Sequence, residues 1–235
     1  EIFEIDLETG DNPFDEPLVA GHYKSELWGL DVDPGSVDNF VTAGDDETVR
    51  YWSIAERRCL SAVNVGACAR AVAVSPTGAT NWASFRGGEE QDADAPRSGV
   101  AVVVGLGGDG GKRDKSVRIG GFKVLNLDRA TGRLTKLDGM AGPSKKALKR
   151  HSKGKKWEWV SDVKFSPAGD MVGFGTHDNR VYVYRFEGGG DAGALRPLAA
   201  CEGHSSYITH FDWSEDGTHL QTNCGAYELL FSDVS

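Results

Sequence analysis

The sequence predicts an all-β fold built from repeated antiparallel sheets. Short apolar runs alternate with polar residues at a period of two, as in VKF at 163–165 and ITHFDW at 208–213. Tight-turn sequences separate these runs, and three of them share one pattern: SPTG at 75–78, SPAG at 166–169 and SEDG at 214–217. Because these strands and turns recur in a fixed order, we expect the chain to consist of structural repeats.

Four copies of the repeat follow one another. The first runs from Gly21 to Ser53, the second starts at Ala69, the third runs from Trp159 to Phe186, and the last runs from Gly203 to Asp233. Each contains an alternating strand, a tight turn, a second apolar strand, a polar turn and a third strand. Pro34 and Pro76 mark equivalent turns 42 residues apart. The longer interval that follows is interpreted as one repeat with two inserts, because it holds one SPTG-type turn.

This period, with Gly-His ahead of the strands and Tyr-Trp at their end, resembles the WD40 repeat. The resemblance implies a β-propeller in which each repeat forms one four-stranded blade. It also implies a buried network of a histidine, a hydroxyl, a carboxylate and a tryptophan that holds each blade. The candidates in the first copy are His22, Thr42, Asp46 and Trp52. Such a network stabilises the blade only when every member is satisfied.

Later copies keep part of this pattern. Asp178 lies six residues before Tyr184, as Asp46 does before Trp52. His204 opens the last copy, but there Ala226 and Ser232 occupy the carboxylate and tryptophan positions. We therefore expect His204 to have a different partner.

A glycine-rich segment offers a competing interpretation. After the apolar run at 100–104, Gly105, Gly107 and Gly110 fit the G-x-G-x-x-G pattern of dinucleotide-binding loops. That loop must open a helix, whose N-terminus meets the pyrophosphate. The following KRDKSVRIGGFKVLNL has no apolar positions at helical spacing and ends in another strand. We therefore predict a long connection between the second and third strands of a blade, and no cofactor.

Several segments are similar, in combination, to the echinoderm microtubule-associated protein-like family. The segments are ELWGLDVDP at 26–34, GFKVLNLDRATGRL at 121–134, VKFSPAGDMVGFGTHDNRVYVY at 163–184 and GHSSYITHFDWSEDGTHLQTNCGAYELLF at 203–231. The similarity covers most of residues 1–78 and 120–235. The two inserts and the changes at Ala226 and Ser232 depart from the family pattern. Family members carry two propellers in tandem, so the resemblance implies about four blades plus a stray strand of a larger propeller.

The predicted layout assigns the whole chain to this propeller. EIFEIDL at the start suggests a strand already under way, so we expect a fragment of a longer protein whose remaining blades are its first partners. The assignments are 1–20, the end of a preceding blade; 21–62, a blade; 63–140, a blade with inserts at about 79–99 and 106–120; 141–156, a basic interblade loop; 157–200, a blade; and 201–235, an incomplete blade.

Composition narrows the function classes. The net charge of −9 argues against nucleic acid as the main partner, and no apolar run is long enough to suggest a membrane span. The four cysteines lack C-x-x-C spacing, which favours free thiols in a reducing compartment. No His, Cys or carboxylate set stands at ligand spacing, so we predict no metal site. No nucleophile elbow or paired acid and base is apparent, so we predict no enzyme.

One segment is strongly basic. SKKALKRHSKGKKW at 144–157 carries seven cationic residues: Lys145, Lys146, Lys149, Arg150, Lys153, Lys155 and Lys156. It is either a solvated loop between blades or a contact for an acidic protein surface. Nearby aromatic residues, Trp157 and Trp159, and the more distant Tyr23, Trp82 and Tyr207, are candidates for the same interface. Core burial is the competing interpretation, favoured for Trp159 and Trp213.

The family resemblance implies the partner. It suggests a non-enzymatic scaffold of the cytoplasmic or ciliary cytoskeleton, including the axoneme, whose propeller loops contact tubulin or other microtubule-bound proteins. A second hypothesis is a general WD40 adaptor for an unrelated protein or peptide. A central concave pocket would favour the adaptor, whereas broad charged outer loops would favour a lattice-binding protein.

Overall fold

The computed structural model describes residues 5–11, 21–23, 25–76, 99–108, 120–144, 157–187 and 194–235. Within these ranges the chain forms fifteen strands and no helix. None of the described residues therefore builds a helix with the length and hydropathy to span a membrane. The all-β fold predicted from the alternating pattern is confirmed.

The strands form four antiparallel sheets, each of which follows chain order. The first contains β1 (Leu27–Val32), β2 (Asn39–Gly44), β3 (Thr48–Ser53) and β4 (Arg58–Asn64). The second contains β5 (Ala69–Val74), β6 (Gly99–Leu106), β7 (Gly121–Asp128) and β8 (Arg133–Gly142). The third contains β9 (Val160–Phe165), β10 (Met171–Thr176), β11 (Val181–Glu187) and β12 (Ala194–Cys201). The fourth contains β13 (Ile208–Trp213), β14 (His219–Cys224) and β15 (Leu229–Asp233).

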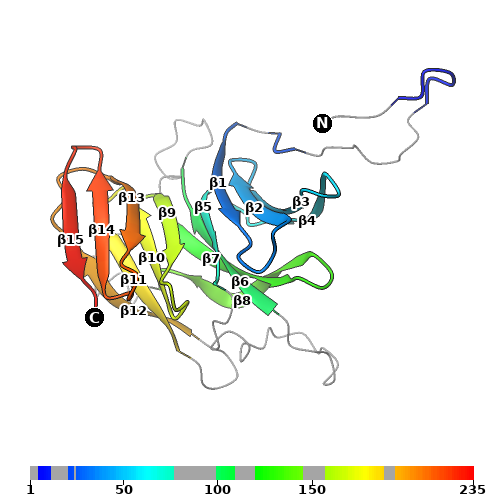
Figure 1. The fold of residues 1–235 in the computed structure, drawn as a ribbon. Coiled ribbons are helices and arrows are strands. Elements are labelled where there is room, and N and C mark those ends of the chain that lie inside the picture. The colour runs from blue at the N-terminus through cyan, green and yellow to red at the C-terminus, as the bar shows by residue number, and fades with distance from the viewer. Residues whose placement is uncertain are drawn as a thin grey trace.

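The sheets succeed one another in space as they do in sequence, from blue to red in Figure 1. The first strands of neighbouring sheets pack together, β1 against β5, β5 against β9 and β9 against β13. This arrangement, with consecutive meanders presenting their first strands to a common side, is that of blades in a β-propeller.

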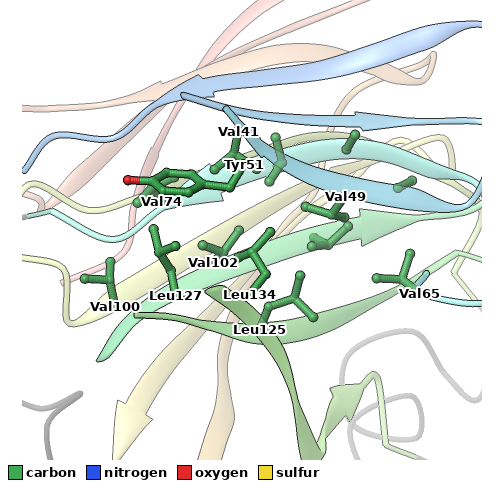
Figure 2. Close-up of a cluster of buried hydrophobic side chains, with 14 of the residues drawn as sticks. Val41, Val49, Tyr51, Val65, Val74, Val100, Val102, Leu125, Leu127 and Leu134 are labelled. Atoms are coloured by element: carbon green, nitrogen blue, oxygen red, sulfur yellow. The ribbon is translucent and has the colours of Figure 1, made fainter. Parts of the chain in front are cut away.

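Apolar layers fill the spaces between the sheets. Between the first two sheets, Val41 and Tyr51 face Val102 and Leu127, all of them buried (Figure 2). Strand β6 alternates between two such layers, because Val100, Val102, Val104 and Leu106 join this layer whereas Ala101 and Val103 join the next. Burial on both faces explains why this strand reads as a continuous apolar run.

Polar contacts also tie the sheets together. Asp33, in the turn after β1, accepts hydrogen bonds from the Arg129 guanidinium of the second sheet at 2.9 and 3.0 Å and from the Tyr51 hydroxyl at 2.8 Å. Asp31 accepts a bond from the backbone N–H of Val74 at 2.8 Å, which links β1 to β5. Asp162 accepts one from Phe211 at 3.2 Å and links β9 to β13 in the same way.

A β-bulge recurs at the start of each first strand. In the pairing of the first and second strands of each sheet, one residue of the first strand has no partner. From the first sheet to the fourth, these residues are Trp28, Arg70, Ser161 and Thr209. A bulge re-aims the side chain of its extra residue and breaks the alternation of the strand. Trp28 and Arg70 are the extra residues in β1 and β5, so their side chains leave the alternation of these two strands.

One sequence expectation is wrong at the amino-terminal end. Residues 5–11 form a turn, in which Asp6 O accepts from Gly10 N at 2.8 Å, and they are exposed. The stray strand expected over 1–7 therefore does not include Ile5 or Leu7. Residues 1–4 lie outside the described part of the chain.

Candidate functional site

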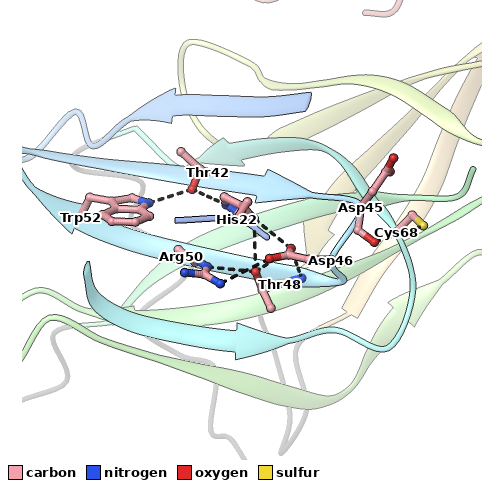
Figure 3. Close-up of polar contacts among 8 residues, drawn as sticks. All are labelled: His22, Thr42, Asp45, Asp46, Thr48, Arg50, Trp52 and Cys68. Carbon is pink, nitrogen blue, oxygen red and sulfur yellow. Dashed lines mark hydrogen bonds and ion pairs between the residues drawn. The ribbon is translucent and has the colours of Figure 1, made fainter. Parts of the chain in front are cut away.

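The four predicted network residues of the first sheet lie together (Figure 3). Trp52 Nε1 donates to Thr42 Oγ1 at 2.7 Å, Thr42 Oγ1 contacts His22 Nε2 at 2.8 Å, and His22 Nδ1 contacts Asp46 Oδ1 at 2.8 Å. Burial would raise the pKa of Asp46, but hydrogen bonds from His22 and Thr48 hold it below its ordinary value. Gly44 lies beside this network, and a larger residue would not fit there because its Cβ would lie 2.8 Å from His22 Nδ1.

The third sheet replaces this polar network with aromatic packing. Asp178 accepts from the Tyr182 hydroxyl at 2.7 Å and also from Thr176. Trp157 is buried and stacks on Tyr182 at a centroid separation of 4.4 Å. It also packs at 5.5 Å from Phe174, which in turn stacks on Phe122 of the second sheet. The expectation that Trp157 is a candidate interface residue is therefore wrong, because it belongs to the core between these two sheets.

In the fourth sheet the histidine keeps the threonine contact of the first sheet, and Glu228 is the different partner that the changes at Ala226 and Ser232 led us to expect. His204 Nε2 contacts Thr222 Oγ1 at 2.7 Å, and Nδ1 lies 3.4 Å from Glu228 Oε2. Cys224 Sγ also approaches the Glu228 carboxylate, at 3.2 Å. The sequence argument overlooked both side chains, because neither stands at a conventional ligand spacing from His204.

A continuous row of stacked side chains crosses the sheets at the end where their first strands begin. We call Trp28, Arg70, Trp159, His177 and Tyr207 the aromatic–cation row. Arg70 Cζ lies 4.2 Å from the Trp28 ring centroid and 4.7 Å from that of Trp159. His177 is 4.3 Å from Trp159 and stacks on Tyr207 at 4.5 Å. Trp28 and Arg70 lie in β1 and β5, Trp159 and His177 flank strands of the third sheet, and Tyr207 immediately precedes β13, so the row reaches from the first sheet to the fourth.

The row is held in place by its surroundings. Arg70 forms an ion pair with Asp45, with Nε 3.0 Å from Oδ1 and Nη2 3.2 Å from Oδ2. Gly107, with φ of 125°, allows Trp159 to approach, since a Cβ at 107 would lie 2.5 Å from Trp159 Cβ. At its two ends the row is accessible, with Trp28 50% and Tyr207 42% exposed. Rigid aromatic groups beside an arginine are the residue types that dominate protein interfaces.

We expect His177 to remain neutral well below the ordinary histidine range. Burial, and then repulsion from the Arg70 guanidinium, lowers the pKa of His177 from 6.5 to about 4. Because the unfolded chain takes up this proton first, stability should fall as the pH drops from 6.5 towards 4. NMR titration of the His177 ring measures the midpoint directly. In His177→Phe this part of the pH dependence should vanish, and a midpoint near 6.5 in the unmodified chain would contradict the stacked geometry.

Some of the other candidate interface residues from the sequence analysis are described in the structure and some are not. The seven basic residues at 145–156 and Trp82 lie outside the described residues. Tyr23 is exposed, whereas Trp213 is half-buried and donates to Lys164 O at 3.2 Å. Trp159 belongs to the aromatic–cation row. The sequence analysis did not identify Trp28, Arg70 or His177. The β-bulges that orient Trp28 and Arg70 cannot be recognised from the alternation of apolar and polar residues in the sequence.

The glycine-rich segment is part of a hairpin. Strands β6 and β7 pair antiparallel from Leu106↔Gly121 to Gly99↔Asp128, as the second and third strands of one sheet. The strand after the glycines therefore returns alongside the first, as predicted, whereas a dinucleotide loop leads into a helix. Residues 109–119 lie outside the described part.

Four meandering sheets with a His-Thr-Asp-Trp network in the first define a β-propeller of the WD40 type. The family model described as "Echinoderm microtubule-associated protein second beta-propeller" matches residues 27–235. The chain belongs to the echinoderm microtubule-associated protein family, within its second propeller.

Similar proteins from other organisms support the assignment to this family. The chain is 30% identical to the ciliary WD repeat-containing protein ctxp80 of Euplotoides octocarinatus, over 97% of this chain and 27% of that protein. It is 32% identical to echinoderm microtubule-associated protein-like 2 of Homo sapiens, over 92% and 25%, respectively. It is 28% identical to the 77 kDa echinoderm microtubule-associated protein of Lytechinus variegatus, over 96% and 26%. The chain thus spans about a quarter of the length of these relatives.

Proposed function

We propose that this chain is part of a non-enzymatic scaffold of the microtubule cytoskeleton, in the cytoplasm or the cilium. The observation that carries the proposal is the family match over residues 27–235, together with relatives named as microtubule-associated and ciliary proteins. The rigid sheets would present their loops and strand ends to tubulin or to other microtubule-bound proteins.

The aromatic–cation row is our first candidate for the contact. Its side chains are already ordered by stacking and by the Arg70–Asp45 ion pair, so little conformational entropy remains to be lost on binding. The basic residues at 145–156 are the second candidate. Their charge would favour an acidic partner surface, with an attraction that salt weakens.

Neighbouring blades of the same longer chain are further proposed partners. Leu27, Leu30 and Val32 of β1 are exposed, as are Leu229 and Phe231 of β15. These apolar side chains lie on the first and last sheets of the set, where additional blades would cover them.

Co-sedimentation with assembled microtubules tests the proposal. The unmodified protein should pellet with microtubules, less so as salt rises. A variant with all seven basic residues of 145–156 changed to Ser should lose the salt-dependent part of this binding. Trp28→Ala combined with Tyr207→Ala should weaken binding at every salt concentration, by about tenfold or more if the row is a hot spot.

Controls separate folding from contact. Tyr227→Ala, which removes an exposed aromatic group outside the row, should bind like the unmodified protein. The unfolding midpoint of each variant should stay close to that of the parent. A protein that remains in the supernatant at low salt would overturn the microtubule proposal and favour the general adaptor. If neither set of substitutions changes binding, the microtubule contact lies in another part of the protein.

A further inference from the structure

The fourth sheet repeats the backbone of the first around its histidine but not the chemistry. Thr222 faces Phe211 across β14 and β13, as Thr42 faces Leu30 across β2 and β1. Tyr227 and Glu47 occupy the same turn position, with φ values of 63° and 66°. With the strands in this register, the position of Asp46 is taken by Ala226 and that of Trp52 by Ser232. The two changes therefore fall on both ends of the hydrogen-bond chain that runs through the histidine.

Hydrogen-bond directions in the first sheet fix the form of His22. Thr42 Oγ1 accepts from Trp52 Nε1 at 2.7 Å, so its own proton goes to His22 Nε2 at 2.8 Å. His22 therefore carries its ring proton on Nδ1 and donates it to Asp46 at 2.8 Å. The partner of each nitrogen decides which one is protonated.

In the fourth sheet the hydrogen bond between the threonine and the histidine has the opposite direction, with the histidine as the donor. Ser232 offers no indole N–H to Thr222, and Thr222 Oγ1 donates instead to the Leu230 carbonyl at 3.4 Å. Thr222 Oγ1 is then the acceptor for His204 Nε2–H at 2.7 Å. This leaves a lone pair on His204 Nδ1. Among the described residues this buried atom has no hydrogen bond of standard geometry, and its charged neighbour, Glu228 Oε2, lies 3.4 Å away; the His204 side chain is only 3% exposed.

His204 Nδ1 belongs to a group of atoms that can bind a metal ion. His204 Nδ1, Cys224 Sγ and one Glu228 carboxylate oxygen all lie within 4.8 Å of one another. Glu228 Oε2 is 3.4 Å from Nδ1 and 3.2 Å from Sγ. Tetrahedral zinc with ordinary bond lengths places such ligands about 3.3–3.6 Å apart. The Nδ1–Oε2 separation of 3.4 Å falls within this range, and the Sγ–Oε2 separation of 3.2 Å lies just below it.

Neighbouring groups orient each ligand. Ser205 donates to Glu228 twice, from N to Oε2 at 2.8 Å and from Oγ to Oε1 at 2.7 Å. The Ala226 N–H donates to Cys224 Sγ at 3.4 Å and orients the sulfur. Thr222 fixes the ring of His204 through Nε2. Metal ligands are supported in this way by a second layer of hydrogen bonds.

We propose that His204, Cys224 and Glu228 form a three-ligand site for Zn²⁺, with the fourth position open to water. Nitrogen, sulfur and oxygen donors together suit zinc, whereas calcium and magnesium prefer oxygen alone. Entry is available through Glu228, whose side chain is 35% exposed, while the other two ligands are buried. The ion would join the segment before β13 to the β14–β15 turn, the link that Asp46 supplies in the first sheet.

A protonated His204 paired with Glu228 is the rival state, and metal binding distinguishes the two. The purified protein, stripped with a chelator, is titrated with Zn²⁺ and separately with Mg²⁺ in a calorimeter. We expect one Zn²⁺ per chain, no Mg²⁺ binding, and a higher unfolding temperature with zinc. Co²⁺ in place of Zn²⁺ should give a thiolate-to-metal absorption band in the near ultraviolet.

Single substitutions identify the ligands. Cys224→Ser should abolish the Co²⁺ thiolate band, and Glu228→Gln should weaken Zn²⁺ binding by about 10–100-fold. Cys201→Ser, a change of a half-buried thiol on β12, should leave both signals intact. A Co²⁺ spectrum without the thiolate band in the unmodified protein would overturn the proposal, whether or not the variants fold. Unchanged Zn²⁺ affinity in a folded Cys224→Ser variant would overturn it as well.

Discussion

Trp157→Ala is expected to lower the free energy of unfolding by about 3–5 kcal/mol. Trp157 is 2% exposed, stacks on Tyr182 and packs against Phe174. It also touches Phe122 of the second sheet, at a centroid separation of 6.1 Å. Removing the indole would leave a cavity between two sheets that rigid strands cannot close. The result should be measured by denaturant unfolding, monitored by fluorescence or circular dichroism.

Two variants show whether the loss comes from packing. Trp157→Phe keeps part of the aromatic contact and should cost clearly less than Trp157→Ala. Trp28→Ala, at a half-exposed position, should have a small effect on stability. A loss below about 1 kcal/mol for Trp157→Ala would mean that Trp157 does not hold the second and third sheets together.

Asp46→Ala should destabilise the first sheet by a similar amount, about 3–5 kcal/mol. The Asp46 side chain is fully buried and contacts His22 at 2.8 Å, Thr48 Oγ1 at 2.7 Å and Arg50 at 3.3 Å. Truncation removes the carboxylate that accepts from His22 Nδ1 and leaves that nitrogen with the more distant Thr48 Oγ1, at 3.3 Å. A buried group that loses its partner costs more than the bond itself contributed.

The comparison variant is Asp212→Ala, whose side chain is 75% exposed and pairs with Lys164 at 3.1 Å. Surface ion pairs contribute about 0–1 kcal/mol, so this change should be nearly neutral. Equal losses in the two variants would argue against the buried network. The pH dependence gives an independent readout. Since the folded pKa of Asp46 is lowered, its contribution should be complete above its ordinary value of 3.8 and fade as pH falls through the folded value.

The proposed zinc site and the first-sheet network are alternative solutions to one problem. Each blade must fix the segment ahead of its first strand to the turn between its second and third strands. In the first sheet a carboxylate and a histidine achieve this. In the third sheet Trp159 does so, because its carbonyl accepts from His177 N at 2.9 Å and its ring lies 4.3 Å from that of His177. The fourth sheet retains the histidine without that carboxylate, and there a thiol and Glu228 converge on it.

Local sequence patterns predict the repeat and the all-β class, and the WD40 resemblance places His22, Thr42, Asp46 and Trp52 in one group. The repeat and the all-β class follow from local rules, namely alternation at a period of two and turn residues at fixed places. The hairpin position of the glycine-rich segment also followed, because a second strand pattern comes after it instead of a helical one.

The two candidate sites depend on contacts between strands and between sheets, which the local sequence pattern does not reveal. Trp28 and Arg70 join the aromatic–cation row because β-bulges rotate them out of the strand alternation, and the other members come from the third and fourth sheets. Trp157, next to a basic run in sequence, is buried because Phe122 and Tyr182 close over it. Likewise His204, Cys224 and Glu228 meet through the register of β13, β14 and β15. Local sequence patterns do not predict such contacts, because the contacts depend on how whole strands and sheets pack against one another.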